Sequence, residues 1–388
     1  MKELIIRNGL LIDKKNGYHA EKKDIYVKDG KIEKIEDHIE MPGVEVIDAE
    51  GSYVSAGFID IHIHNNLKPQ PGRKHEPAPL ESVDEIGVDR GATTVIECGS
   101  WCVQDIDEFV EKSDAARSRY YTLLSGHGEE GFGTLGSQDV EKINPEHYYE
   151  VVKRHPGYVL GLKVANSNTI TNDRGYSLTK HAKMIAKHLG MPLTIHIGNF
   201  PPDPMGLIEF LEEGDVVTHT YHGKEVSLFK PDGTPKDGVV RARKRGVLFD
   251  VGHGSASFSF AVYDRARRKG FLPDMISTDI RAINITGPVF SLPTVMSKFL
   301  SLDMPLEDVV EKVTSKPAEV YHLNDLGELK VGKAADIEIF HVEDVDIELP
   351  DCYYNMQRVN KLIRPTSVIV SKHDGSEVYP VVAGSPME

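Results

Sequence analysis

Hydrophobic residues in the first part of the chain occur in short β-rich stretches broken by turn residues. Residues 3–54 contain Asn-Gly and Asp-Gly pairs between apolar runs, as in Ile25-Tyr26-Val27-Lys28-Asp29-Gly30. Such pairs are typical of hairpin turns. A similar β-rich apolar stretch occurs near the end of the chain in Ser367-Val368-Ile369-Val370-Ser371. We therefore expect residues 1–55 and 330–388 to form one small β-domain together, a β-sandwich.

Residues 56–329 have a different pattern, in which short apolar runs alternate with amphipathic stretches. The runs are residues 57–64, 93–97, 121–125, 159–163, 193–196, 216–219, 247–251 and 275–279. Helical stretches lie between or after them at residues 106–119, 178–189, 205–211 and 292–300. Such alternation is typical of repeated β-α units. It predicts an α/β protein with an eight-stranded (β/α)8 TIM-like barrel, whose functional side chains lie at the carboxyl ends of the strands.

Side chains that bind metals stand at several of these carboxyl ends. His62 and His64 point to the same side of a strand, where two imidazoles can bind one metal ion. Further runs end in Lys163, His196, His219 and Asp279. Taken alone, each also fits a structural role, as a packed histidine, a solvated lysine or a helix-capping aspartate. Their convergence on one rim favours a functional site, and Asp60 is expected to support a ligand imidazole.

Composition limits the partners of the chain. The 45 basic and 60 acidic residues give a formal net charge of -15, so we expect neither nucleic acid nor a membrane as partner. No apolar run has transmembrane length and the first residues do not resemble a signal peptide, so we expect a cytoplasmic protein. Three cysteines, Cys98, Cys102 and Cys352, indicate neither a disulfide framework nor a cysteine metal site.

These features resemble the amidohydrolase superfamily of metal-dependent hydrolases. The similarity covers nearly the whole chain, including the run that ends in His62-Ile63-His64 and the closing segment Gly327-Glu328-Leu329-Lys330-Val331-Gly332-Lys333-Ala334-Ala335-Asp336-Ile337. The resemblance implies two divalent metal ions, most simply zinc. One ion would be held by His62, His64 and Asp279, and the other by His196 and His219. Lys163 would bridge them as N6-carboxylysine, a carbamate formed with CO2.

A carbamate explains a lysine in that position, because a free ammonium repels a cation and has no lone pair to donate. The implied reaction is attack of a metal-bridged hydroxide on a carbonyl-like carbon. Asp279 would be the catalytic residue that takes a proton from the nucleophile and passes it to the leaving group. A mononuclear enzyme with an unmodified Lys163 is the alternative for the metal site.

Four segments, residues 194–199, 218–224, 249–254 and 277–280, are similar to bacterial metallohydrolases labelled dihydroorotase-like or adenine-deaminase-like. The better-supported activity of that group is deacetylation of small acetylated hydroxy acids or amino acids. Dihydroorotases carry an arginine two residues after the second histidine, where this chain has Asn66. We therefore expect a deacetylase that cleaves an amide or ester. The alternatives are an adenine-type deaminase, a hydantoinase-like cyclic amidase or a non-enzymatic scaffold, which the complete ligand set disfavours.

A small anionic molecule is the expected substrate. Related sequences tend to have an arginine two residues past the bridging lysine and a histidine two residues past the last aspartate, where this chain has Ala165 and Arg281. We hypothesise that Arg281 has become the cationic anchor of a substrate carboxylate; a structural ion pair is the alternative. Three further candidates for substrate binding, on the same predicted rim, are His127, His222 and His253. A homo-oligomer is compatible with the sequence.

Overall fold

Strands from both ends of the chain form one eight-stranded sheet in the computed structural model, which describes residues 1–65, 80–128, 140–372 and 375–386. Its order is β15-β14-β13-β5-β1-β2-β3, with β4 beside β1. The strands are β1 (Glu3–Asp13), β2 (Tyr18–Lys28), β3 (Lys31–Glu36), β4 (Glu45–Asp48), β5 (Tyr53–Ala56), β13 (Ile337–Pro350), β14 (Met356–Lys372) and β15 (Gly375–Pro380). The two ends meet where β5 and β13 pair. Strands from the two ends of the chain therefore join one sheet, as their similar sequence patterns predict. The packing of this sheet as a β-sandwich and the limits of the domain stay predictions.

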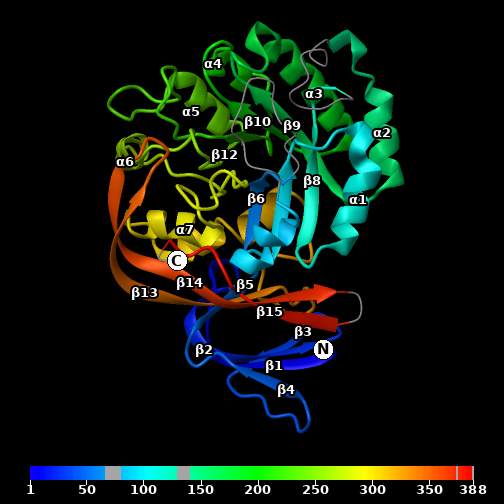
Figure 1. Cartoon of the computed structure of the whole chain (residues 1–388), viewed down its shortest axis with the longest axis vertical. Helices are drawn as coiled ribbons and strands as arrows, with labels where there is room; N and C mark the ends of the chain where they lie inside the picture. Colours follow the sequence, from blue (N-terminus) through cyan, green and yellow to red (C-terminus); the bar gives the residue numbers. More distant parts are fainter. Residues whose placement is uncertain (66–79, 129–139, 373–374, 387–388) are drawn as a thin grey trace.

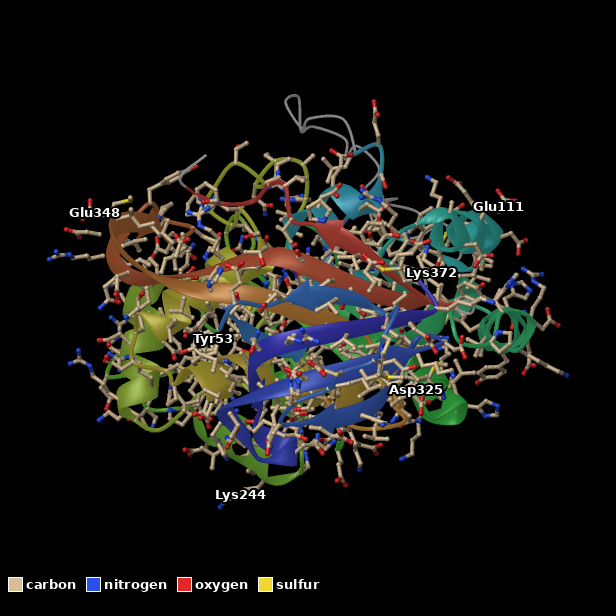
Figure 2. All side chains as sticks on the ribbon, turned by 90° about the horizontal axis from the view of Figure 1, so that it is seen from below. Tyr53, Glu111, Lys244, Asp325, Glu348 and Lys372 are labelled. Carbon is tan, nitrogen blue, oxygen red and sulfur yellow. The ribbon has the colours of Figure 1, made fainter. Side chains whose placement is uncertain are left out.

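Alternate residues of this terminal sheet build a core of their own. Leu4 and Ile6 on β1, Ile25 and Val27 on β2 and Ile337 on β13 belong to one buried cluster. Their spacing of two residues places them on one face of their strands. Figure 2 views the molecule from below and shows the strands running across that side. The sheet therefore forms one end of the molecule, below most of the rest of the chain in Figure 1.

The middle of the chain forms a parallel sheet of seven strands in consecutive order. They are β6 (Ile59–Ile63), β7 (Thr94–Cys98), β8 (Arg119–Ser125), β9 (Val159–Asn166), β10 (Leu193–Ile197), β11 (Val216–Thr218) and β12 (Leu248–Phe249). Every residue of β6 and β7 is buried, which explains their unbroken apolar character. The sheet curls, and helices lie around its outside (Figure 1).

The helices are α1 (Ile106–Ala115), α2 (Pro145–Arg154), α3 (Gly175–Leu189), α4 (Pro204–Ile208), α5 (Asp237–Lys244), α6 (Phe260–Arg268), α7 (Leu292–Leu300), α8 (Leu306–Glu311) and α9 (Ser315–Val320). The prediction for α7 is correct at both ends. The predicted helix over 106–119 is too long, because Ala116 turns to an extended conformation with ψ 147° and β8 follows. Within the described residues, no helix has both the length and the apolar composition that crossing a bilayer requires.

The predicted strand over residues 275–279 is not a regular strand. Met275 forms a single parallel bridge with Asp250, and Ile280 forms one with Ile63, the last residue of β6. Between these bridges the backbone N–H of Thr278 donates to the Asp60 carboxylate, and Asp279 has a left-handed φ of 51°. This interrupts the regular ladder. The segment nevertheless connects the two edges of the curled sheet.

Candidate metal centre

His62, His64 and Asp279 lie together where β6 meets the 275–280 segment. The Nε2 atom of His64 is 3.4 Å from Asp279 Oδ1, and the Nε2 atom of His62 is 3.8 Å from the same oxygen. One ligand atom of each residue lies within 4.8 Å of the others. Two imidazole nitrogens and one carboxylate oxygen at this spacing can hold one divalent ion.

The other three predicted ligands adjoin this group. His219 Nε2 is 4.0 Å from Asp279 Oδ2, and the ring centroids of His219 and His196 are 4.4 Å apart. Lys163 Nζ lies 3.3 Å from His62 Nε2. The strands β6, β9, β10 and β11 end at the same side of the parallel sheet, which brings these side chains together, although β9 continues past Lys163 to Asn166 and not, as predicted, only to Lys163. The structure brings together all six residues that the sequence placed at strand ends.

Hydrogen bonds orient three of the imidazoles. The Nδ1 atoms lie 3.0 Å from Thr218 Oγ1 for His62, 2.9 Å from Glu97 Oε1 for His64 and 2.6 Å from the Gly252 carbonyl oxygen for His219. Each Nδ1–H donates, which leaves the Nε2 lone pair for a ligand. Second contacts of this kind are typical of metal-binding histidines. The donor set and its orientation therefore fit a metal centre.

Burial keeps three histidines of the site, His62, His196 and His219, neutral. It lowers the pKa of His62, His196 and His219 well below the ordinary value, and the charge of Lys163 lowers that of His62 further. Neutral imidazole is the form that binds metals. The protein therefore presents these rings in the ligating state at neutral pH.

Two of the strand-end residues have unusual backbone conformations. His219 has φ 67° and Asp279 has φ 51°, in the left-handed region that costs a non-glycine residue about 1–3 kcal/mol. The turn at Gly252 and Gly254 packs closely against them. A Cβ atom at Gly254 would lie 2.2 Å from Asp279 Oδ2, and one at Gly252 would lie 2.8 Å from His219 Nδ1. Only glycine fits this close approach.

Similarity to known proteins identifies the family of this chain. The sequence model of the amidohydrolase family matches residues 53–387, a range that contains the parallel sheet and all six converging residues. The chain belongs to the amidohydrolase family. It is 34% identical over 383 residues to a deacetylase of Enterococcus faecalis, a match that covers 97% of this chain and 99% of that protein.

Solved structures agree with this assignment. The crystal structure of an adenine deaminase superposes with a TM-score of 0.87 at 32% identity, over 97% of this chain and 99% of that one. The crystal structure of a dihydroorotase superposes with a TM-score of 0.86 at 30% identity, over the whole of both chains (100% each). This amidohydrolase is therefore a hydrolase, and its relatives carry names from several reaction types.

Among the described residues, the Asp60 carboxylate forms no hydrogen bond with an imidazole, so the expectation for it is wrong. Its carboxylate accepts hydrogen bonds from the backbone N–H and hydroxyl of Thr278 and from the backbone N–H of His62. Burial raises the pKa of Asp60 to about 7, although these hydrogen bonds lower it. Instead, Thr218 supports the His62 ring. Asp60 joins β6 to the 275–280 segment and so fixes the backbone of the amidohydrolase site.

The predicted substrate-binding histidines differ in their surroundings. Both ring nitrogens of His253 are engaged, because Lys298 Nζ lies 2.8 Å from Nε2 and Nδ1 lies 3.0 Å from the Gly254 carbonyl oxygen. His127 Nε2 accepts from the backbone N–H of Ala165 at 2.8 Å. His222 Nδ1 accepts from the backbone N–H of Lys224 at 3.1 Å.

These contacts do not favour His253 as a substrate ligand, since neither of its nitrogens remains for one. The substrate roles of the other two histidines and of Arg281 stay predictions. Arg281 directly follows Ile280 of the bridging segment, and its backbone N–H donates to Asn284. Asn66, on which the prediction against dihydroorotase activity depends, lies outside the described residues.

Two neighbours of the site were missed by sequence reasoning. Glu97, on β7, holds His64 and also accepts from the backbone N–H of Asn65 at 2.6 Å. Cys98, which ends the same strand, lies with Sγ 2.9 Å from Lys163 Nζ. Both residues stand at the carboxyl end of a strand. The same position in other strands identified the predicted ligands, so it could also have identified these two residues.

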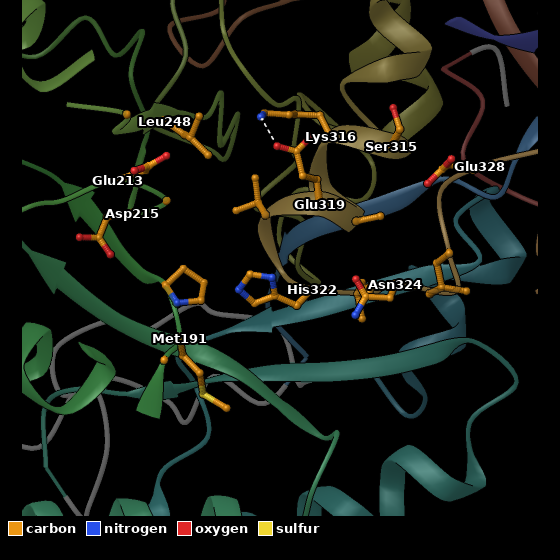
Figure 3. A pocket seen from close by; sticks show the side chains of 18 of the residues that line it. Met191, Glu213, Asp215, Leu248, Ser315, Lys316, Glu319, His322, Asn324 and Glu328 are labelled. Carbon is orange, nitrogen blue, oxygen red and sulfur yellow. Dashed lines mark hydrogen bonds and ion pairs between the residues drawn. The ribbon is translucent and has the colours of Figure 1, made fainter. Parts of the chain in front are cut away.

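A cavity of about 790 Å³ lies away from this centre (Figure 3). Met191, Asp215 and Leu248, which line it, precede or begin strands β10, β11 and β12. The cavity therefore opens at the amino ends of the strands, whereas His196 and His219 lie at the carboxyl ends. Its lysines are paired within the protein: Lys316 contacts Glu319 at 3.2 Å, and Lys183 contacts Asp215 at 2.6 Å. Barrels of this type carry their chemistry at the other end.

Proposed function

We propose that this amidohydrolase is a metal-dependent deacetylase that releases acetate from a small amide or ester bearing a carboxylate. The observation that carries the proposal is the convergence of imidazole Nε2 atoms on the Asp279 carboxylate. His62, His64 and Asp279 would hold one divalent ion, and His196 and His219 a second. Lys163 would lose a proton and form an N–C bond to CO2, giving an anionic N6-carboxylysine between the two. Zinc suits these ligands.

Different residues of the site would have different roles in this hydrolysis. When bound, the ions would polarise the scissile carbonyl and lower the pKa of the attacking water. Asp279 accepts the proton that this water loses and transfers it to the leaving amine or alkoxide oxygen. Thr218 and Glu97 keep the rings of His62 and His64 in place. Hydrolysis then yields acetate and the free hydroxy or amino acid.

Full-length similarity to a deacetylase supports this reaction over its alternatives. The structural likeness to an adenine deaminase and a dihydroorotase keeps deamination and ring opening as the second candidates. Asn66 argues against dihydroorotase activity, because it offers no guanidinium to a substrate carboxylate. We also propose the complete fold as an eight-stranded barrel over 56–329, with 275–280 as its last strand, joined to a β-sandwich from 1–55 and 330–388.

Acetate release tests the function directly. Zinc-loaded protein would be incubated with a panel of N-acetyl and O-acetyl acids, with adenine and dihydroorotate as controls. We expect acetate from at least one acid, and its loss in His64→Ala. Acetate from none of them would overturn the deacetylase, and ammonia from adenine or opening of dihydroorotate would identify the alternative.

Arg281 is tested in the same assay. If it anchors the substrate carboxylate, Arg281→Ala raises KM for the acidic substrate. An unchanged KM would show that Arg281 does not anchor the carboxylate, and it would not contradict the proposed metal centre.

A further inference from the structure

Lys224 lies in a tight turn that directly follows the metal centre. The turn begins at His219, whose carbonyl accepts from the backbone N–H of His222 at 3.4 Å. The backbone N–H of Lys224 then donates to His222 Nδ1, and that of Gly223 donates to the Tyr353 hydroxyl at 2.9 Å. These contacts fix the backbone of Lys224 close to the metal centre.

The ammonium of Lys224 lacks a protein partner in the described part of the chain, although its side chain is half-buried. By contrast, the half-buried Lys183 contacts Asp215 at 2.6 Å, and the buried Lys298 contacts two backbone carbonyl oxygens at 2.7 Å. Removing an unpaired charge from water is costly. An unpaired ammonium beside a reaction centre therefore indicates an anionic ligand.

The surroundings of Lys224 agree with a position at the rim of the centre. Burial lowers its pKa, while the nearby Asp279 carboxylate raises it. Its charge in turn lowers the pKa of His219 and of His196, after burial as the main cause for both. In the same turn, His222 is fully buried and its Nε2 has no hydrogen-bond partner among the described residues. The turn thus contains two polar groups, the Lys224 ammonium and His222 Nε2, that have no hydrogen-bond partner among the described residues.

We propose that Lys224 binds the carboxylate of the substrate and thereby selects acetylated hydroxy acids or amino acids over their neutral analogues. This inference rests on the proposed deacetylase function and names the residue that recognises the acid. A lysine ammonium is a compact charge with three donors, which suits a carboxylate presented from several directions. Binding the carboxylate there also keeps it from competing with the acetyl carbonyl for the metals.

Paired substrates separate carboxylate binding from other roles of the ammonium. N-acetylalanine is compared with N-acetylalaninamide, and O-acetyllactate with O-acetyllactamide, in zinc-loaded wild type, Lys224→Met and Lys224→Arg. Lys230→Met, a change of an exposed lysine in the same loop, is the matched control. We expect Lys224→Met to raise KM for the acids roughly 10- to 100-fold, as for loss of a charge-assisted hydrogen bond, and to leave KM for the amides unchanged. Lys224→Arg should retain most of the preference.

Equal losses on acids and amides would overturn the proposal, because they would place Lys224 at the reacting carbonyl instead. No loss on either would overturn it as well. Thermal melting of each variant shows that the fold is retained.

Lactate binding distinguishes failure of this inference from failure of the function. Lactate is titrated calorimetrically into zinc-loaded wild type and Lys224→Met, and we expect at least about tenfold weaker binding by the variant. Weaker lactate binding without acetate release from any substrate would overturn the deacetylase and support the anchor. Acetate release with equal lactate binding and unchanged KM would overturn the anchor alone.

Discussion

The Nδ1 atom of His62 lies 3.0 Å from the hydroxyl oxygen of Thr218, and that hydroxyl donates to Asp250 at 2.6 Å. Because the Thr218 proton is directed to Asp250, its oxygen accepts the Nδ1–H of His62. All three side chains are buried. The relay therefore fixes both the tautomer and the orientation of His62, and leaves Nε2 to a metal.

Thr218→Val should weaken zinc binding roughly 10- to 100-fold, because it removes the acceptor that orients His62 while retaining the shape of the side chain. Competition with a chromophoric chelator measures the affinity. Thr220→Val is the matched control, since the Thr220 hydroxyl donates to the Val217 carbonyl at 3.2 Å and contacts no imidazole among the described residues. Equal zinc affinity in wild type and Thr218→Val would show that the relay does not serve the metal.

The Arg119–Asp336 ion pair should contribute strongly to stability. Asp336 accepts from the guanidinium at 3.1 and 2.6 Å, and its carboxylate also accepts from the backbone N–H of Ser371 at 2.9 Å. It is only 3% exposed. Asp336→Asn should lower the free energy of unfolding by about 2–4 kcal/mol, because it disrupts a buried charged network between β8 and the terminal sheet.

The matched control is Asp346→Asn. Asp346 also contacts an arginine through two nitrogens, but Arg358 and Asp346 are 72% and 71% exposed. Water screens such a pair, so its loss should cost at most about 1 kcal/mol. Denaturant unfolding compares the two variants, and equal effects would contradict the role assigned to burial.

Glu338→Gln should become increasingly more stable than wild type as pH rises. Glu338 is fully buried on β13, and burial raises its pKa well above the ordinary value of 4.5 for a glutamate. Above that value the unfolded chain has lost this proton while the folded protein keeps it, so unfolding is favoured by rising pH. The stability gap should grow by at most about 1.4 kcal/mol per pH unit.

Chemical denaturation of both proteins from pH 5 to 8 measures this gap. Glu348→Gln, a change at an exposed position of the same strand, should show no such trend. A gap that is constant with pH would mean that Glu338 ionises normally in the folded protein.

The candidate metal centre was largely predictable from sequence because its residues obey two simple regularities. A strand has a period of two, which places His62 and His64 on one side, and parallel strands end at one edge of their sheet. These regularities also placed Lys163, His196, His219 and Asp279. The helix Leu292–Leu300 was equally clear, since Ser291 caps its first turn by accepting from the backbone N–H of Thr294.

Other contacts depend on features that the pattern does not contain. Cys98 and Lys163 meet across β8, so their proximity depends on the curl of the sheet and not on the spacing of residues. The backbone of Asp279 is left-handed and lies close to Gly254, and the regular strand that the apolar run predicts is interrupted there. Lys224 lies in a loop, where no periodicity indicates which way a side chain points.

Metal content per chain shows whether Lys163 and the histidines hold two ions or one. Protein purified without metal would be reconstituted with zinc and bicarbonate, desalted, and analysed by elemental mass spectrometry for wild type and Lys163→Met. We predict two zinc ions per wild-type chain, activity that depends on bicarbonate, and no more than one tightly bound ion in the variant. One tightly bound ion in the wild type, with activity unaffected by bicarbonate, would contradict the bridged two-metal centre.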